Sequence, residues 1–281
     1  MKTAETRPDP SAGAAVADDK RLRIGVVGPT GRMGQKVCAL VEAAPDLVLA
    51  CCVGVEGEPT GQTIGAVDAA MGRGDLAPID VLIDFSHRSA IAAHGAFCAR
   101  HGVAWILGTT GLEATDEVAV AAASGQTLVF QAANFSIGVA LLLDLAARAA
   151  RVLGVEADVE IVESHHHHKV DAPSGTALAI AKAVAGARSQ ALNEVVRHGR
   201  HGLVGARPRG EIGMHALRLG DVVGHHELHF AWPAEGLVLT HDARDRAVFA
   251  EGAVRAARFA AHRRRGGAVG RIGMAELLAG D

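Results

Sequence analysis

The chain has 281 residues, of which 49% are hydrophobic and 21% charged, and its formal net charge is −3. This length is enough for two modest domains with a substantial core. The small net charge gives no electrostatic basis for binding nucleic acid or an anionic membrane, and charges interrupt every apolar run well before the ~20 residues that cross a bilayer. We therefore expect a globular protein whose partners are small molecules or further copies of itself.

The first 20 residues are rich in Ala, Pro and Asp and lack the continuous apolar segment of a secretory signal. We interpret residues 1–20 as a disordered leader, and we expect the protein to be cytoplasmic. The four cysteines, Cys38, Cys51, Cys52 and Cys98, show no CxxC spacing. This favours small buried side chains in a reducing compartment, with a redox pair as the less favoured alternative.

From residue 22 onward, short β-rich runs alternate with Ala-rich amphipathic segments, which is typical of βαβ units and a parallel sheet. We predict strands at 22–28, 47–53, 81–86, 103–108 and 127–132. The predicted helices between them cover roughly 32–44, 89–101 and 115–124. This pattern defines an α/β domain over residues 21–135.

The pattern changes after residue 135. A helix at 137–153, a strand at 158–164 and a helix at 171–187 are followed by strands at 211–219, 222–230 and 236–243 with little helix between them. This predicts a second, α+β domain over residues 136–244 with an open antiparallel or mixed sheet. We expect a final helix at 245–262 to pack back on the first domain, so residues 245–281 are assigned to it.

The segment "GVVGPTGRMG" places Gly28, Gly31 and Gly34 directly after the first predicted strand and into the first predicted helix. Glycines in this position let the backbone approach a pyrophosphate at the helix N-terminus, as in dinucleotide-binding Rossmann domains. The spacing GxxGxxG departs from the common GxGxxG, and the alternative is a tight turn that binds nothing.

Two further segments, "GTTG" (108–111) and "AANFS" (132–136), follow the fourth and fifth predicted strands. They should face the carboxyl edge of the sheet, where a nicotinamide would lie. Each alone is equally compatible with ordinary turn chemistry, but together they favour a cofactor cleft.

The end of the second predicted strand lacks the usual acidic reader of the adenosine ribose. It reads Val53, Gly54, Val55, and Glu56 is the first acid. Arg32 could instead meet a 2′-phosphate or contact the pyrophosphate. We therefore expect either NADH or NADPH to be used.

The stretch "ESHHHHKVDAPSGTA" (163–177) lies mid-chain, which excludes an expression tag. A metal site is disfavoured because consecutive histidines on an extended chain point to opposite faces and no nearby Cys or carboxylate completes a ligand set. Histidine suits proton transfer near neutral pH, Lys169 supplies a cation, and "DAPSGT" has the form of a helix N-terminus that attracts a carboxylate. A solvated basic surface would show the same residues.

This stretch closely resembles the E-x-H-H-x-H-K-x-D-A-P-S-G-T-A signature of the 4-hydroxy-tetrahydrodipicolinate reductase family of the bacterial diaminopimelate and lysine pathway. The resemblance extends from about Leu22 to the C-terminal helix and includes "GRMG", "DFS", "GTTG" and "AANFSIGV" in the same order. It implies a Rossmann domain, an α+β domain whose open sheet builds a homotetramer, and NAD(P)H-dependent reduction of a small dicarboxylate. In the family, hydride goes to ring C4, water is lost, and a proton is added at C3.

The resemblance also implies roles for individual residues. His165 and Lys169 match the catalytic proton donors, and His168 is assigned a structural role and His167 none. The positions that match substrate binding are His166, Ser174, Gly175 and Thr176. The positions that match cofactor binding are Gly28, Pro29, Thr30, Gly31, Arg32, Met33, Gly108, Thr109, Thr110, Ala132, Ala133, Asn134 and Phe135, and Arg246 and Phe249 match positions near the cofactor.

Three other interpretations remain. A nucleotide sensor that turns nothing over would have no need of Lys169 together with the "PSGT" helix start. A histidine-based metal hydrolase would have no need of the glycine loop, and "HHELH" (225–229) lacks HExxH spacing and is better explained as sheet surface or a subunit contact. A semialdehyde dehydrogenase would need a nucleophilic Cys, which no motif presents.

Overall fold

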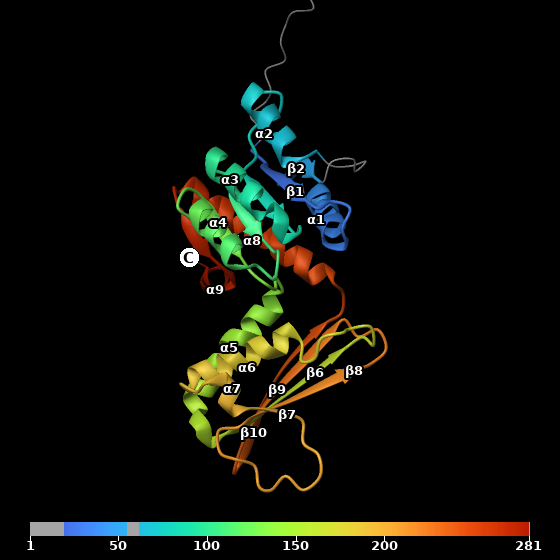
Figure 1. The fold of residues 1–281 in the computed structure, drawn as a ribbon, viewed down its shortest axis with the longest axis vertical. Helices are drawn as coiled ribbons and strands as arrows, with labels where there is room; N and C mark the ends of the chain where they lie inside the picture. The colour runs from blue at the N-terminus through green and yellow to red at the C-terminus, as the bar shows by residue number, and fades with distance from the viewer. Residues whose placement is uncertain (1–19, 55–61, 281) are drawn as a thin grey trace, which may run out of the picture.

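The computed structural model describes residues 20–54 and 62–280. Residues 1–19 of the predicted leader, together with Val55 and Glu56, lie outside the described residues. The chain forms two lobes, each built on its own sheet. The chain passes between them at the start of α5 (Ile137–Leu153) and again at the start of α8 (Ala247–Arg265), as Figure 1 shows.

The first sheet is parallel throughout and has the order β11-β5-β4-β3-β1-β2. Its strands are β1 (Leu22–Val27), β2 (Leu47–Val53), β3 (Val81–Asp84), β4 (Ala104–Leu107), β5 (Leu128–Gln131) and β11 (Gly270–Ile272). The order reverses between β1 and β3. In open α/β sheets the crevice at the carboxyl ends of such strands is where nucleotides bind.

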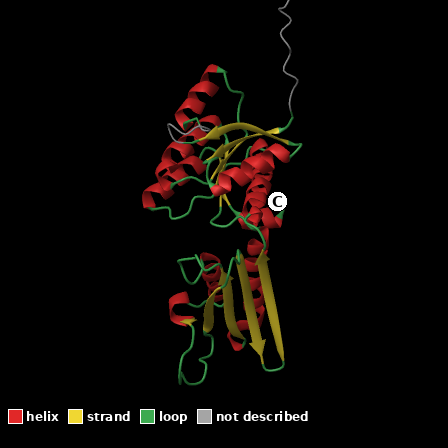
Figure 2. Ribbon diagram, turned by 90° about the vertical axis from the view of Figure 1, so that its right-hand side faces the viewer, coloured by secondary structure: helices red, strands yellow, loops and turns green. Residues whose placement is uncertain are grey.

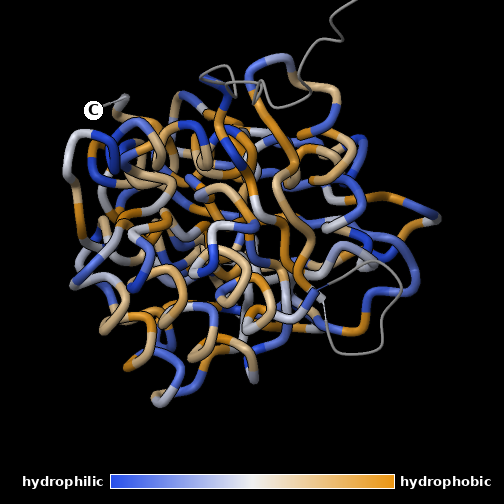
Figure 3. The backbone as a smooth tube through the Cα atoms, turned by 90° about the horizontal axis from the view of Figure 1, so that it is seen from above, coloured by the Kyte–Doolittle hydropathy of each residue, from blue (hydrophilic) through white to orange (hydrophobic). Residues whose placement is uncertain are grey.

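Helices cover both faces of this sheet. One face packs against α1 (Arg32–Ala43) and α8, and the other against α2 (Ile64–Arg73), α3 (Ile91–His101) and α4 (Ala114–Ser124). The central strands β3 and β4 are buried along their whole length, which explains their almost continuous apolar sequence. Hydrophobic segments accordingly run through the middle of the molecule in the view from above (Figure 3).

The C-terminal segment completes the first lobe. Helix α8 packs against β3, β4, β5 and α1, β11 pairs with β5, and α9 (Met274–Ala279) follows. The buried face of α8 is made mainly of Ala and Gly, which lets the helix approach the sheet closely. At Gly252 an added Cβ would overlap the carbonyl oxygen of Phe135.

The second sheet is mixed, with the order β10-β9-β6-β8-β7. Its strands are β6 (Asp158–His165), β7 (Val196–His198), β8 (Ile212–Arg218), β9 (Gly224–Trp232) and β10 (Glu235–Ala243). The strands β6, β9 and β10 pair antiparallel, whereas β6 and β7 each pair parallel to β8. The parallel pairing follows from α6 (Gly175–Ala187), because it forms the crossover between β6 and β8. The predicted open mixed sheet is confirmed.

Only one face of this sheet is covered by helices in the described part of the chain, as Figure 2 shows. Helices α5 and α6 pack on that face with the apolar side chains of β6, β8 and β9. Helix α6 leads into the short α7 (Leu192–Val195). Single-turn 3₁₀ segments occur at Arg88–Ala90 and Gly154–Glu156.

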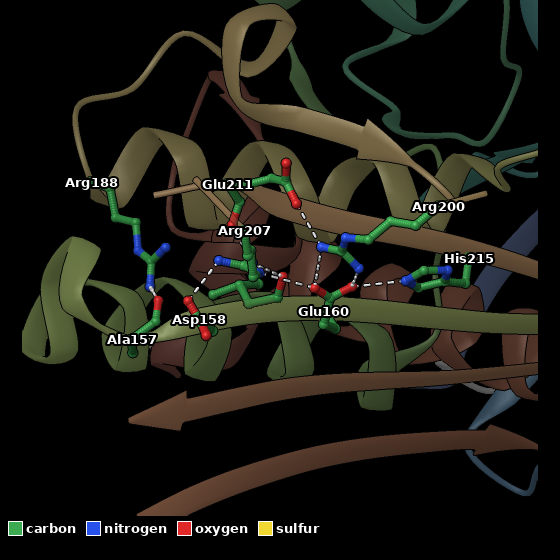
Figure 4. Close-up of polar contacts among 9 residues, drawn as sticks. Ala157, Asp158, Glu160, Arg188, Arg200, Arg207, Glu211 and His215 are labelled. Atoms are coloured by element: carbon green, nitrogen blue, oxygen red, sulfur yellow. Dashed lines mark hydrogen bonds and ion pairs between the residues drawn. The ribbon is translucent and has the colours of Figure 1, made fainter. Parts of the chain in front are cut away.

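On the open face, one carboxylate anchors the loop between β7 and β8. Glu160 accepts hydrogen bonds from Arg200 at 2.7 Å, Arg207 at 3.2 Å and His215 at 2.7 Å (Figure 4). Burial disfavours its charge, but these donors outweigh burial and lower the pKa of Glu160 to about 2. Gly213 leaves the space that the Glu160 carboxylate occupies.

Candidate active site

The glycine loop joins β1 to the start of α1. Gly28 has φ +70° and Gly31 is the N-cap of α1, so the first amides of the helix are directed toward the loop. Gly34 packs so closely on the Gly28 carbonyl that a Cβ would overlap it. Arg32 and Thr30 are exposed, Pro29 is buried and Met33 half-buried. The arrangement is suited to an anionic group at a helix N-terminus.

The loop after β3 is held by a buried carboxylate. Asp84 accepts hydrogen bonds from His94 at 2.8 Å, Trp105 at 3.2 Å and the Ser86 amide at 3.0 Å. Burial opposes ionisation of Asp84, but the hydrogen bonds and the His94 ring outweigh it and lower its pKa. Asp84 therefore fixes the "DFS" turn at the carboxyl edge of the sheet.

The loops after β4 and β5 pack on this turn. At Gly108 any side chain would overlap the ring of Phe85, and Thr109 donates its hydroxyl to the Ser86 carbonyl at 3.0 Å. Thr110 is exposed. The ring of Phe135 is core, 5.5 Å from Phe85 and 5.9 Å from Phe130, so Phe135 could offer a cofactor only its backbone.

Asn134 connects the two lobes. Its side chain accepts from the Ser136 amide at 2.8 Å and donates to the hydroxyl of Thr176 at 3.2 Å. Ala132 and Ala133 lie between the end of β5 and Asn134; Ala132 is half-buried and Ala133 is exposed. The predicted cofactor loop and the predicted substrate turn are thus in direct contact.

His165 is the last residue of β6, and its side chain is 11% exposed. Its Nδ1 lies 2.6 Å from Oε2 of Glu163, and its ring lies edge-on to that of His226 at 5.2 Å. Because an ionised carboxylate only accepts hydrogen bonds, Nδ1 is the protonated nitrogen. Nε2 is left to exchange a proton with a bound molecule.

The other residues of the histidine run follow in a turn. His166 Nε2 lies 3.2 Å from Arg246 Nη2, and its Nδ1 is buried without a partner in the described residues. Desolvation and the nearby Arg246 cation lower the pKa of His166, which favours its neutral form. His167 contacts the Gly220 carbonyl at 2.8 Å and is exposed, as is His168, whose ring centroid lies 3.9 Å from that of His167.

Lys169 and the start of α6 lie beside this turn. Lys169 pairs with Asp171 at 2.9 Å. Helix α6 begins at Gly175 and not near residue 171, because Ser174 is its N-cap and accepts the amide of Ala177 at 3.1 Å. The Gly175 position is open, and Thr176 is half-buried. The first amides of α6 therefore form a second helix terminus with the polarity that attracts an anion.

A cavity of about 470 Å³ lies between the lobes. Its lining is predominantly cationic or imidazole and comprises Arg32, Lys36, His166, His168, Asp221, Val223, Asp245 and Arg246. Lys36 and Asp245 pair across it at 3.1 Å. The glycine-loop helix, the histidine run and the start of α8 thus share one cavity, which suits an anionic ligand that spans both lobes.

Two family models match the chain. "Dihydrodipicolinate reductase, N-terminus" matches residues 22–135 and "Dihydrodipicolinate reductase, C-terminus" matches residues 138–278. The chain belongs to the dihydrodipicolinate reductase family. Members of this family are oxidoreductases that use a pyridine nucleotide, and the resemblance inferred from the sequence motifs is confirmed.

A curated relative agrees with this assignment, and two solved structures share the fold. The 4-hydroxy-tetrahydrodipicolinate reductase of Psychrobacter arcticus is 44% identical over 249 residues, which cover 85% of this chain and 89% of that protein. The dipicolinate-bound dihydrodipicolinate reductase of Paenisporosarcina sp. TG-14 has the same fold, with a TM-score of 0.68 at 23% identity over 90% of this chain and 97% of that one. DAP dehydrogenase of C. glutamicum in complex with DAP matches with a TM-score of 0.54 at 12% identity, over 91% of this chain and 93% of that one.

In this reductase-family chain, the contacts of His165 with Glu163 and with His226 were not predicted from the motif. Glu163 precedes His165 by two residues, so both side chains point to one face of β6, a signal that was present in the sequence. Arg218 contacts Glu163 from β8, 55 residues away, and no local pattern links them. His226, whose Nε2 lies 3.2 Å from Ser174 Oγ, is likewise distant in sequence. Burial is the main cause that lowers the pKa of His226 to about 4.

The remaining features bear on the other interpretations. In residues 20–54 and 62–280 no group of three or more His, Cys, Asp or Glu side chains is arranged to hold a metal ion. No helix in those ranges is long and apolar enough to cross a membrane. The sulfurs of Cys38 and Cys52 lie 4.0 Å apart, and burial, followed by the neighbouring Cys52, raises the pKa of Cys38 to about 12.

Proposed function

We propose that the protein reduces 4-hydroxy-tetrahydrodipicolinate to tetrahydrodipicolinate with NADH or NADPH, in diaminopimelate and lysine biosynthesis. The observation that carries the proposal is the shared cavity, which is lined by Arg32 and Lys36 from the first lobe and by His166 and His168 from the second. Arg32, from the residues assigned to the cofactor, and His166, from those assigned to the substrate, therefore face the same space.

The residues of the first lobe fit a dinucleotide. Gly28 to Met33 would hold the pyrophosphate at the start of α1, and Gly108 to Thr110 and Ala132 to Phe135 would line the nicotinamide end. The nicotinamide, when bound, supplies the hydride that goes to ring C4 of the substrate. Gly54 follows β2 with no acid at the ribose position, so NADH and NADPH are both accepted.

The second lobe would bind the two carboxylates. One belongs at the start of α6, where Ser174 caps the helix and the amides of Gly175 and Thr176 lie at the positive end of the helix dipole. His166 and Arg246 line the cavity and lie 3.2 Å apart. The structurally similar Paenisporosarcina reductase binds dipicolinate, which is a planar dicarboxylate of this kind.

Proton transfer belongs to His165 and Lys169. With Nδ1 committed to Glu163, His165 exchanges its proton through Nε2. Lys169, 20% exposed and paired with Asp171, is the second donor, and its charge also attracts the substrate. Water is lost from ring C4 and a proton is added at C3.

We also propose the larger organisation. Residues 21–135 with 245–281 form the dinucleotide-binding unit, and residues 136–244 form the substrate-binding unit. The helix-free face of the second sheet is the surface through which four copies would assemble as a homotetramer. The enzyme acts in the cytoplasm.

The test is cofactor oxidation by the purified protein, with substrate generated in the cuvette by the preceding synthase from pyruvate and aspartate semialdehyde. Consumption of NADH or NADPH that depends on the synthase is the expected result. A nucleotide sensor would bind the cofactor and leave it unoxidised. That outcome would contradict the proposal.

A further inference from the structure

We propose that Glu163 is the positioning residue of the site: its single carboxylate fixes the proton-donating tautomer of His165 and the turn that receives a substrate carboxylate. The proposal rests on the reductase function proposed above. Its support comes from the contacts of Glu163, its burial, and the point at which α6 begins.

Glu163 is fully buried on β6, on the same face as His165. Its Oε2 accepts the Nδ1 proton of His165 at 2.6 Å, and its Oε1 accepts the backbone amide of Ser174 at 3.1 Å. Arg218 Nη1 donates to both oxygens, at 3.1 and 3.0 Å, and Nη2 donates to Oε1 at 3.1 Å. A carboxylate with this set of donors has little freedom to move.

The charge on Glu163 is maintained despite its burial. Burial by itself would raise the pKa of Glu163, but the hydrogen bonds from Arg218 and His165 outweigh it and lower the pKa. An ionised Glu163 accepts only, so the neutral His165 ring must carry its proton on Nδ1. The same negative charge stabilises the imidazolium that forms when Nε2 takes up a proton.

The space around Nε2 supports this division of roles. Gly224 on β9 faces the ring, and a Cβ there would lie 3.3 Å from Nε2. In the described part of the chain no atom hydrogen-bonds to Nε2. The other titratable groups near the ring are His226 from β9, which burial keeps neutral, Arg218 from β8, which shares the Glu163 carboxylate, and the adjacent His166. The Lys169–Asp171 pair follows in the next turn. Glu163 is the carboxylate in direct contact with His165.

The second contact of Glu163 extends its effect to the substrate turn. Ser174 is the N-cap of α6, so the hydrogen bond from its amide sets where the helix begins and where the amides of Gly175 and Thr176 point. Arg218 also donates to the Asp171 carbonyl at 2.5 Å, and Asp171 pairs with Lys169. The ion pair of the half-buried Arg218 with the buried Glu163 therefore contacts His165 and the N-cap of α6 directly, and it reaches Lys169 through Asp171.

The first measurement is made on the wild-type protein with ¹⁵N-labelled histidine, and the His165 ring signals are assigned by their loss in H165A. We expect the neutral ring to be protonated on Nδ1. A neutral ring protonated on Nε2 would overturn the proposal. This readout requires neither catalytic activity nor a stable Glu163 variant.

The second measurement compares E163Q, E163D and the matched control E160Q, which alters a carboxylate on the same strand but on the opposite face. We expect E163Q to lower kcat roughly 10²–10⁴-fold, the scale for losing a correctly oriented general acid, with NADPH affinity within about twofold of wild type. E163D should recover part of kcat because it restores the charge. The alkaline limb of kcat against pH should move to lower pH in E163Q, because the imidazolium loses its counter-ion.

An E163Q kcat within about threefold of wild type, or an equal loss in E160Q, would overturn the proposal. So would an E163Q defect that changes NADPH affinity and kcat together without moving the pH profile, since that indicates general misfolding. An inactive wild-type protein would instead contradict the reductase function, and the tautomer of His165 would still decide the role of Glu163.

Discussion

Two glutamates on β6, three residues apart, participate in networks that look alike and differ in what they can do. Each carboxylate contacts arginine and histidine: Glu163 contacts Arg218 and His165, and Glu160 contacts Arg200, Arg207 and His215. Because side chains alternate along a strand, positions 160 and 163 lie on opposite faces of the sheet. Glu163 contacts His165 and the Ser174 amide at the start of α6. Glu160 lies on the helix-free face, where Figure 4 shows its contacts.

The comparison shows that a carboxylate–histidine contact is not in itself a mark of catalysis. The arginines around Glu160 are also matched by Asp158 and Glu211, so that network is closed on itself and fastens a loop. The Glu163 network leaves His165 Nε2 without a hydrogen-bond partner among the described residues, and it adjoins the N-terminus of α6. What distinguishes the two is an available nitrogen beside an anion-binding helix start.

The largest expected effect on the Glu163 side is that of H165A. Removing the proposed proton donor should lower kcat by ~10²–10⁴-fold, the usual contribution of general acid catalysis. Steady-state kinetics in the synthase-coupled assay measures it, with NADPH binding as the control. Unchanged turnover would remove His165 from the mechanism and erase the contrast between the two faces.

K169A should also reduce turnover, by about 10²-fold, because it removes a proposed donor and a cation that attracts the substrate. Its KM should rise as well, since part of the loss is in binding. The proposed cofactor site is in the other lobe, so NADPH affinity should stay unchanged. Loss of folded protein in place of activity would reassign Lys169 to a structural role.

On the Glu160 side the expected effect is on stability. E160Q should lower the free energy of unfolding by about 1–3 kcal/mol, the range for half-buried charged hydrogen bonds, and leave kcat within about twofold. Urea unfolding at fixed protein concentration measures the first, and light scattering checks that the assembly is unchanged. A large fall in kcat with an intact assembly would show that the open face contributes to catalysis.

The difference in unfolding free energy between wild type and E160Q depends on pH through the pKa of Glu160, which is lowered from 4.5 to about 2. A depressed pKa means that the stabilisation is complete above about pH 4.5 and is lost as the pH falls toward 2. The stability gap between wild type and E160Q should therefore be constant near neutral pH and shrink in acid. A gap that widened in acid would show that the charge on Glu160 is not its source.

The smallest expected effect lies in the first lobe. If Gly54 leaves the ribose pocket without an acid, the affinities for NADH and NADPH should agree within about tenfold, or ~1.4 kcal/mol. Isothermal titration of each cofactor measures the ratio. A hundredfold preference in either direction would mean that another residue reads the ribose.

The sequence predicted the parts of the fold that carry a long local pattern. The strands of the first sheet up to β5, helices α1, α3, α4, α5 and α8, and the mixed second sheet were all anticipated. It missed β7 and β11, which have three residues each, and α7 and α9, which have four and six, because such segments are too short for a periodicity. Helix α2 was also missed, since its Gly and Asp residues weaken the helical pattern.

For the candidate site, the sequence likewise predicted what is local and missed the contacts between distant segments. The motif placed His165, Lys169 and the start of α6 in one region, because they are neighbours in sequence. The bonds from Arg218 to Glu163, from His226 to Ser174 and from Asn134 to Thr176 join segments 42 to 55 residues apart. These depend on strand register and on the packing of the two lobes, which no local pattern encodes.

The central claim is that a nicotinamide bound in the cavity delivers hydride to the substrate ring. It is tested most directly with NADPH in which deuterium replaces the hydrogen that is transferred from the nicotinamide. The product formed by the wild-type enzyme with synthase-generated substrate is analysed by NMR. The account predicts one deuterium at ring C4. Deuterium at another carbon, or cofactor oxidation with no deuterium in the product, would contradict it.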